Sequence, residues 1–501
     1  MTTTETSGAT SGVKNRATRG VTSPDGANVA LSASALINGQ QRSSGQTCEI
    51  RDPYRGDVVG TMDISSTDDL DDALEAAAQT RDMAAAMPGY ERAALLRRIS
   101  QLIERDTESL AQLMTRETGK AITDARAEIR RSLETFALAG EEAIRIEGRH
   151  IPLDGSPMGA GKMAFLMRFP VGVVAAITPF NAPFNLAAHK IAPSIAAGNT
   201  LVLKPPPQAP LIVHKLVELV AEAGTPAGMV NTVYGDAEIG AALITDPRVE
   251  FITFTGSSRA GAAIKAASGL CRVALELGGN GTTIVHEDAD LEAAAAVCAR
   301  NSMRLAGQSC ISVQSVYVMR AVYEQFVKLI ANEIGKLKLG DPLEPQTDVG
   351  TLINEEAAKR VESWVQQAVA DGAQALTGGQ RHGAAFEPTL LIDVKPKMEV
   401  VCEEVFGPVV NVIAVDTLQD AFNAVNASPY GLQAGIFTKS NEVTFEAIRR
   451  MRVGGIIING TSTWRTDQLA YGGVRSSGNG REGPRYAIEE MTEQRLIVFN
   501  L

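Results

Sequence analysis

Short apolar runs rich in β-branched residues alternate with alanine-rich helical segments from Phe169 onward. This alternation limits the possible folds, because a helix between consecutive strands is the usual connection of parallel strands. The sequence therefore predicts an α/β fold with mostly parallel sheets and crossover helices. One series of expected strands covers residues 171–177, 200–203, 229–233, 251–254 and 273–275, and a second covers 283–285, 313–318, 409–415, 434–437 and 456–459.

Helical periodicity also precedes and separates these strands. Apolar positions recur at helical spacing after Asp68, Glu91 and Thr123, with acidic residues early in each segment. Residues 148–164 are rich in Gly and Pro and interrupt the pattern. Residues 494–499 are one more expected strand, which could pair with another chain or with residues 148–164. Between the strands, helices are expected at residues 210–223, 291–306, 322–334, 357–370 and 443–450.

The length and charge of the chain exclude several classes of protein. A chain of 501 residues exceeds what one core usually serves, so two or three domains are expected. A net charge of −11 argues against broad binding to nucleic acid or an anionic membrane. No apolar run approaches the length of a membrane span. Residues 1–30 are rich in Thr, Ser, Gly and Ala without the apolar core of a secretory signal, which predicts a disordered N-terminal tail.

The five cysteines are few, odd in number and widely spread. This pattern indicates reduced thiols in a cytoplasmic compartment rather than a disulfide framework. The sequence has no CxxC pair and no close Cys/His cluster, so no metal site is expected.

One of these cysteines, Cys310, ends the stretch Gly307-Gln308-Ser309-Cys310. A cysteine framed by Gly and small polar residues, between an expected helix and an expected strand, is placed like a nucleophile. Most cysteines are instead buried and inert, and spacing alone leaves that reading open. Upstream, Glu276 could activate water and the Asn181 amide could donate to an oxyanion. Together the three residues describe acyl chemistry through a thioester.

In this order, the segments around Asn181, Glu276 and Cys310 resemble the aldehyde dehydrogenase superfamily, and the resemblance extends from about Ile37 to Leu501. It implies that Cys310 attacks an aldehyde, that Asn181 holds the oxyanion and that Glu276 activates the water that hydrolyses the thioester. The implied partners are an aldehyde, NAD or NADP, and further copies of the chain in a homodimer or homotetramer.

The resemblance also implies an architecture. It has a Rossmann-like cofactor-binding domain, an α/β catalytic domain and a small β arm for oligomerisation. We expect the NAD(P)-binding domain at residues 31–145 and 166–281, the catalytic domain at 282–483, and the arm at 146–165 and 484–501.

Cofactor binding has one candidate that the pattern suggests by itself. From Phe251 an apolar strand runs into Gly256 and Ser257 at an expected helix start, where free N–H groups favour a pyrophosphate. A plain strand–helix turn has the same pattern. The match to GxGxxG at residues 478–483 does not follow a hydrophobic strand, and we interpret it as a flexible turn. The resemblance assigns cofactor binding to Ile177, Thr178, Pro179, Phe180, Lys204, Pro207, Gly256, Ser257, Leu277, Glu404 and Phe406.

Pro207 departs from the family pattern. Many members that prefer NAD carry a Glu at this position, which contacts the 2′-hydroxyl, whereas proline has no side-chain donor or acceptor. A strict preference for NAD is therefore not expected, and nothing at this site repels NADP.

The substrate positions implied by the resemblance are Ala182, Leu186, His189, Trp464, Arg465 and Tyr471. We hypothesise a polar pocket in which His189 and Arg465 face a hydroxyl or an anionic group of a small aldehyde. The alternative is that His189 is a packing residue and that Arg465 points to solvent or pairs with Asp467. Three other functions stay open: oxidation of an apolar aldehyde, transfer of the acyl group to coenzyme A, and a non-catalytic binding or structural role.

Overall fold

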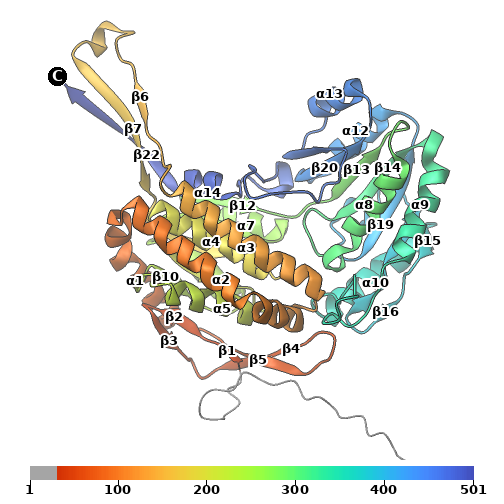
Figure 1. Cartoon of the computed structure of the whole chain (residues 1–501), viewed down its shortest axis with the longest axis horizontal. Coiled ribbons are helices and arrows are strands. Elements are labelled where there is room, and N and C mark those ends of the chain that lie inside the picture. The colour runs from red at the N-terminus through yellow and green to blue at the C-terminus, as the bar shows by residue number, and fades with distance from the viewer. Residues whose placement is uncertain (1–30) are drawn as a thin grey trace, which may run out of the picture.

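The computed structural model describes residues 31–501, and the expected tail at residues 1–30 lies outside this range. Two seven-stranded sheets form the body, and a three-stranded sheet projects from it as an arm (Figure 1). Among residues 31–501, no helix has both the length and the apolar composition needed to span a membrane. The expected α/β class with parallel sheets is confirmed.

The first large sheet has the spatial order β12-β11-β8-β9-β10-β2-β3, and its first five strands run parallel. Chain order reverses between β8 and β11. In open α/β sheets such a reversal opens a crevice at the carboxyl ends of the strands, where ligands bind. The strands are β2 (Ala35–Ile37), β3 (Gln40–Arg42), β8 (Val173–Ile177), β9 (Thr200–Lys204), β10 (Val230–Thr232), β11 (Phe251–Thr255) and β12 (Arg272–Glu276).

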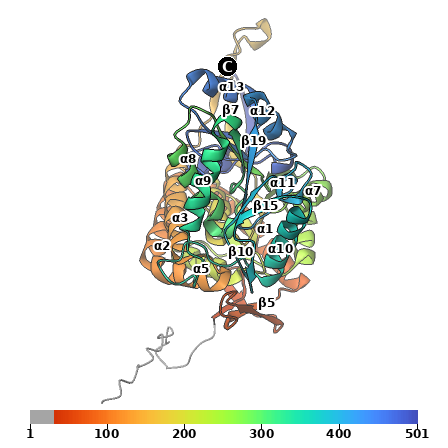
Figure 2. The same ribbon diagram turned by 90° about the vertical axis from the view of Figure 1, so that its right-hand side faces the viewer.

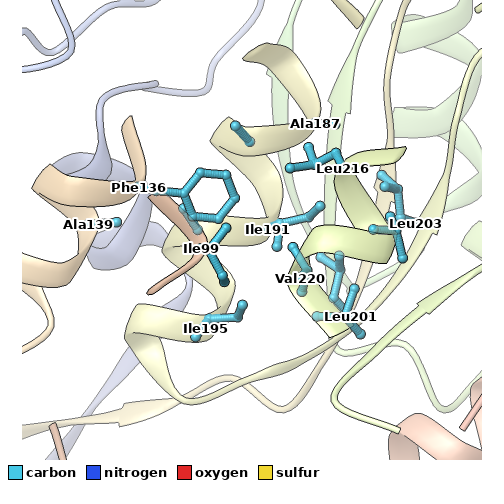
Figure 3. Close-up of a cluster of buried hydrophobic side chains, with 14 of the residues drawn as sticks. Ile99, Phe136, Ala139, Ala187, Ile191, Ile195, Leu201, Leu203, Leu216 and Val220 are labelled. Atoms are coloured by element: carbon cyan, nitrogen blue, oxygen red, sulfur yellow. The ribbon is translucent and has the colours of Figure 1, made fainter. Parts of the chain in front are cut away.

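Helices cover both faces of this sheet. Side chains of α2, α3, α4 and α5 pack on one face, where Ile99, Phe136 and Ile191 are fully buried (Figure 3). The opposite face carries α1, α6 and α7. Burial of both faces explains why the strand sequences are almost continuously apolar. The helices are α1 (Thr67–Ala86), α2 (Gly89–Thr118), α3 (Ile122–Glu142), α4 (Pro183–Ala197), α5 (Pro210–Glu222), α6 (Ala237–Thr245) and α7 (Ser258–Ala267).

The second large sheet has the order β15-β18-β19-β14-β13-β20-β21, and β15 is its one antiparallel member. Figure 2 shows α8 and α9 on one side of β19 and α10 and α11 on the other. The strands are β13 (Gly281–Val285), β14 (Val313–Met319), β15 (Gln374–Thr377), β18 (Thr389–Ile392), β19 (Val409–Val415), β20 (Gln433–Phe437) and β21 (Gly455–Ile458). The helices are α8 (Leu291–Met303), α9 (Tyr323–Gly335), α10 (Glu355–Ala370), α11 (Glu399–Cys402), α12 (Leu418–Ala427) and α13 (Asn441–Arg450).

The arm consists of β22 (Thr492–Asn500), β7 (Lys162–Pro170) and β6 (Arg149–Ile151), all antiparallel. The C-terminal strand thus pairs within the chain. Helix α14 (Pro484–Glu490) lies outside the arm and packs on α3 and α4. Smaller elements are β1 (Leu31–Ala33), β4 (Thr47–Arg51), β5 (Val58–Asp63), β16 (Arg381–His382), β17 (Ala385–Phe386), η1 (Pro157–Gly159), η2 (Arg304–Gly307), η3 (Arg320–Val322) and η4 (Arg475–Ser477).

Most expected elements are present, with boundaries shifted by one or two residues, but the end of one expected helix was wrong. The strand expected at 171–177 begins at Val173, because Gly172 has a φ of +120°. The helix expected at 291–306 ends at Met303, because Leu305 and Ala306 have φ of +57° and +50°. Residues 148–164 interrupt the helical pattern, and they include β6 and the start of β7.

Candidate active site

The carboxyl ends of the first sheet face the segments that precede strands of the second sheet. Asn181 follows β8 and Glu276 ends β12, whereas Cys310 precedes β14. All three line one cavity of about 280 Å³. Its other lining residues are Pro179, Phe180, Leu186, Thr255, Gly256, Ser257, Leu277, Gly278, Glu404, Phe406, Arg465, Tyr471 and Glu482.

The loop that presents Cys310 has an unusual backbone. Leu305, Ala306 and Gly307 lie in the left-handed region, with φ of +57°, +50° and +70°. The two non-glycine residues store strain, which surrounding packing must hold in place and which is often found at functional sites. At Gly307 a Cβ would lie 1.9 Å from the carbonyl oxygen of Gly407, so this position accepts only glycine.

A second glycine lets β13 approach this loop. A Cβ on Gly279 would lie 2.1 Å from the carbonyl oxygen of Cys310. Gly279 therefore permits a close approach between its own backbone and that of Cys310.

Cys310 differs from the other cysteines in its surroundings. It is half-buried, borders the cavity, and its Sγ lies 3.2 Å from the hydroxyl oxygen of Tyr471. Burial raises the pKa of the Cys310 thiol to about 12, while the hydrogen bond with Tyr471 acts in the opposite direction. Cys298 is fully buried in α8, and burial raises its pKa further. Among the five thiols, Cys310 alone lines this cavity.

Two N–H groups beside Cys310 are available to a reacting oxygen. The Asn181 side chain donates from Nδ2 to the carbonyl oxygen of Gln308 at 3.0 Å, which leaves its second amide hydrogen free. Within residues 31–501, the backbone N–H of Cys310 has no hydrogen-bond acceptor. These two donors can form an oxyanion hole.

Glu276 is buried, and neither of its carboxylate oxygens has a hydrogen-bond partner among the described residues. Burial and the nearby Glu482 carboxylate raise its pKa well above the usual value, against the opposing charges of Lys190 and Arg465. Residues 478–483 pack closely against Glu276, since a Cβ on Gly480 would lie 2.9 Å from Glu276 Oε1. An unpartnered carboxylate with a raised pKa is suited to accept a proton from water.

A buried ion cluster lies beside Glu276. Glu482 Oε1 lies 3.1 Å from Lys190 Nζ, and Glu482 Oε2 lies 3.1 Å from Arg465 Nη1. Burial alone would raise the pKa of Glu482, but Lys190, His189 and Arg465 hold it well below its usual value. Glu482 is therefore ionised, and its pKa is shifted in the opposite direction to that of Glu276.

The structure decides how His189 and Arg465 are placed. Arg465 does not point to solvent: its side chain is 7% exposed, pairs with Glu482 and lines the cavity. His189 is fully buried and does not line the cavity; its Nε2 lies 3.4 Å from Asp467 Oδ1 and from Arg465 Nη2. Asp467 pairs mainly with Arg131 at 2.8 Å. The position of Arg465 thus agrees with the polar-pocket hypothesis. His189 does not line the pocket and contacts Arg465 instead.

A second cavity of about 190 Å³ meets the first at Cys310. Ala182 and Leu186 line this second cavity, as expected. Trp464 is 55% exposed and lines neither cavity. Polar groups on α3 form one wall. The residues shared by both cavities are Asn181, Leu186, Cys310, Arg465 and Tyr471. The second cavity also contains Asp124, Ala127, Glu128, Arg131, Asn185, Asn301, Arg304, Leu305, Ser309, Ile311 and Thr463.

The reversal point between β8 and β11 fits a dinucleotide. The N-terminus of the ten-residue helix α7 lies directly after β11, with Gly256 and Ser257 in the cavity wall. Lys204 ends β9; burial lowers its pKa to about 8, and Asp236 offsets part of this shift. Pro207 and the buried Thr178 lie outside the cavity.

The opposite cavity wall carries Glu404 and Phe406. Glu404 accepts a hydrogen bond from the Gly279 N–H at 3.0 Å, and burial raises its pKa to about 7. The Phe406 ring meets Phe180 edge-on at 5.9 Å. These groups can hold a ribose and a flat ring. Ile177, like Thr178, Lys204 and Pro207, lies outside this wall.

Several site residues were not found by sequence reasoning. Arg131 faces the second cavity from α3, where Asp124, Glu128 and Thr135 share its face. Their helical spacing is a signal that could have identified this wall. The 478–483 segment is not a flexible turn: the N–H groups of Asn479 and Gly480 both donate to the Leu275 carbonyl at 3.0 Å. Other residues brought in by the fold are Thr255, Lys190, Gly278, Asp467 and Glu482.

No group of three or more His, Cys, Asp or Glu side chains within residues 31–501 is arranged to hold a metal ion. The sequence profile of the aldehyde dehydrogenase family matches residues 40–497. The chain belongs to the aldehyde dehydrogenase family.

Individual relatives agree over nearly the whole chain. A 3-sulfolactaldehyde dehydrogenase from Priestia aryabhattai is 43% identical over 466 residues, which cover 93% of this chain and 97% of the relative. Aldehyde dehydrogenase 21 from Physcomitrella patens, solved with the reaction product succinate, superposes with a TM-score of 0.91 at 37% identity, covering 94% of this chain and 99% of that one.

An NADP-dependent glyceraldehyde-3-phosphate dehydrogenase from Bacillus halodurans C-125, solved with NADP, superposes with a TM-score of 0.91 at 35% identity, covering 94% of this chain and 99% of that one. The expected family is confirmed. This aldehyde dehydrogenase is an oxidoreductase that uses NAD or NADP.

The loop geometry predicts the effect of Gly307→Ala. The added Cβ collides with a backbone oxygen, so the Cys310 loop must move, and a displacement of about 1 Å can cost about 100-fold in rate. We expect kcat/KM for an aldehyde to fall by about 100-fold. Gly383→Ala is the control, because its φ of +62° is also strained but nothing lies within 4 Å of its Cβ. Equal activity in both variants would contradict the prediction.

Proposed function

We propose that this aldehyde dehydrogenase oxidises a small anionic aldehyde to its carboxylate by a hydrolytic mechanism. The observation that carries the proposal is an excess of positive charge around the buried Arg465, beside the nucleophile. Arg465 lines both cavities, and its charge acts to lower the pKa of the Cys310 thiol.

The charges around Arg465 do not balance. Three cationic side chains, Arg131, Lys190 and Arg465, share two ionised carboxylates, Asp467 and Glu482. Burial and the nearby Glu482 raise the pKa of Glu276 well above its usual value, so Glu276 contributes less negative charge than an ordinary glutamate. An anionic group entering the second cavity would complete the balance, because a planar guanidinium suits a carboxylate, phosphate or sulfonate.

In this mechanism the Cys310 thiolate attacks the aldehyde carbonyl. The Asn181 amide and the Cys310 backbone N–H bind the oxygen as it becomes negative. NAD or NADP supplies the hydride acceptor when it is bound, held by residues at the ends of β9 and β11 and by Glu404 and Phe406. Oxidation leaves an acyl thioester on Cys310.

Glu276 then takes a proton from water, which attacks the thioester and releases the acid. Glu482 has a different part: ionised between two cations, it raises the pKa of Glu276 and fixes Arg465. This division of roles between two nearby carboxylates follows from their surroundings.

The relatives support a small, charged substrate. Two of them, 3-sulfolactaldehyde dehydrogenase and glyceraldehyde-3-phosphate dehydrogenase, are named for short aldehydes that carry an anionic group. For an apolar aldehyde, by contrast, the buried Arg465 would be an unfavourable neighbour. A coenzyme A-acylating reaction has no need of Glu276 as a base, and a non-catalytic role would leave its placement without a purpose.

The domain division and the assembly are part of the proposal. We assign cofactor binding to the first large sheet with its helices, the nucleophile to the second, and subunit contacts to the arm. The arm has unpaired edges at β6 and β22 and exposes Leu496, Val498 and Phe499. Such edges favour pairing with another copy, which supports a homodimer or homotetramer. Pro207 in place of an acidic side chain supports use of NADP as well as NAD.

Loss of the cationic groups should discriminate between substrates. We expect Arg131→Gln and Arg465→Gln to lower kcat/KM for an anionic aldehyde such as 3-sulfolactaldehyde about tenfold more than for neutral lactaldehyde, because only the anion loses its ion pair. Arg126→Gln is the matched control: it lies on the same helix but pairs with Glu108 away from both cavities. A similar loss for both aldehydes would overturn the anionic-substrate proposal.

Glu276→Gln should separate oxidation from hydrolysis. Without the general base, thioester hydrolysis should slow by about 100-fold or more, while oxidation of the first equivalent continues. Rapid mixing should show a burst of about one reduced cofactor per active site, followed by a slow phase, and mass spectrometry should detect acylated Cys310. A variant that turns over at the wild-type steady rate would exclude Glu276 as the base.

The raised pKa of Glu276 predicts how hydrolysis depends on pH. A base acts only when ionised, and the ionised fraction increases as pH rises toward the raised pKa. Decay of the preformed acyl-enzyme in single-turnover experiments should therefore accelerate as pH rises and level off at a higher pH than an ordinary glutamate would give. In Glu276→Gln this dependence should disappear. A wild-type decay rate that is already constant at pH 5 would contradict the assignment.

A further inference from the structure

The Tyr471 hydroxyl is the one side-chain group within hydrogen-bond distance of Cys310 Sγ in the described part of the chain. Its oxygen lies 3.2 Å from Cys310 Sγ. Tyr471 is 5% exposed, so solvent does not compete for this contact.

The ring of Tyr471 is fixed on several sides. Its backbone pairs with Glu482 in both directions, with the Tyr471 N–H donating at 3.1 Å and the Glu482 N–H donating at 2.6 Å. The Arg465 guanidinium carbon lies 3.7 Å from the ring centroid. Ile311 and Leu432 also pack against Tyr471. The hydroxyl is therefore held toward Cys310 rather than free to rotate away.

We propose that Tyr471 donates a hydrogen bond to the Cys310 thiolate and so increases its population and reactivity. The inference rests on the proposed function for the role of Cys310 as nucleophile. It assigns to Tyr471 a contact with the reacting sulfur, beyond the substrate-lining position expected from the sequence.

The physical basis is a difference between the two protonation states of the sulfur. A neutral thiol is a weak partner for a phenol, whereas a thiolate accepts a charge-assisted hydrogen bond from it. Only the second interaction is strong, so it favours loss of the thiol proton. Arg465 adds to the effect, because a cation over the ring withdraws electron density and makes the O–H a better donor.

Proton balance is simple. Cys310 loses its proton to solvent, and Tyr471 keeps its own, since burial raises the pKa of the phenol well above its usual value. The other charged groups that act on the thiol are Arg465, which favours the thiolate, and Glu404 and Glu482, which oppose it. Glu276 lies near Tyr471 and helps to raise the pKa of the phenol. Without Tyr471, Arg465 alone would favour the Cys310 thiolate against the opposing charges of Glu404 and Glu482.

The test is the alkylation of Cys310 by iodoacetamide in the full-length protein without aldehyde or cofactor. The second-order rate is measured from pH 6 to pH 10, and peptide mass spectrometry assigns the label to Cys310. We expect Tyr471→Phe to raise the apparent thiol pKa and to slow labelling about tenfold at pH 7.5. Tyr317→Phe on β14 is the matched control and should match the wild type.

A second measurement separates donation from packing. Incorporation of 3-fluorotyrosine at position 471 makes the phenol a stronger donor with little change in shape, so the apparent thiol pKa should fall. Changes in opposite directions for phenylalanine and fluorotyrosine would establish the donor role. An unchanged thiol pKa in both, or a rise in both, would overturn it. If Tyr471→Phe does not fold, as judged by circular dichroism, the fluorotyrosine protein decides alone: a lower thiol pKa supports the donor role, and an unchanged or raised one overturns it.

These readouts are independent of the substrate. If the preference for anionic aldehydes is wrong but Tyr471 acts as proposed, the alkylation profiles still shift. If Cys310 is not the nucleophile, its labelling will be no faster than that of the other four cysteines, and both proposals fail together in a recognisable way.

Discussion

The buried carboxylate of Glu482, ionised between Lys190 and Arg465, is the interaction on which the site depends. It joins the 461–483 segment to α4, since Lys190 belongs to that helix. Removing one partner would leave an uncompensated charge in a closed interior, which is among the most destabilising changes a protein can undergo. Because Arg465 is fixed by this pair, the Tyr471 ring on which it stacks is fixed as well.

The Glu482 carboxylate also explains why the pKa values of Glu482 and the nearby Glu276 are shifted in opposite directions. Glu482 has two cationic partners, whereas Glu276 has no hydrogen-bond partner among the described residues and lies in the field of Glu482. One therefore stays charged and the other has a raised pKa. The excess of cations that remains around Arg465 is the feature that supports an anionic substrate. Structural stability, base strength and substrate charge are thus linked through one ion cluster.

Much of the fold and part of the site could be predicted from the chain. The alternation of strands and helices predicted parallel sheets, because the hydrophobic period is a local property. Helix α4 was missed, although its residues are almost all buried, because an apolar run with Pro193 inside it lacks an amphipathic pattern. The left-handed turn at Leu305 and Ala306 was missed for a different reason: neither residue type favours it, and only packing holds it.

The sequence by itself determined the family, the α/β class and the segments that carry Asn181, Glu276 and Cys310, because short motifs and periodicity are written in neighbouring residues. Tertiary structure alone decided which distant groups surround them. Arg131, Lys190, Asp467 and Glu482 come from three separate segments, and no local pattern sets their distances or burial. The ionisation of a buried acid depends on every charge near it, so the roles of Glu276, Glu482 and Tyr471 could be inferred only once the chain was folded.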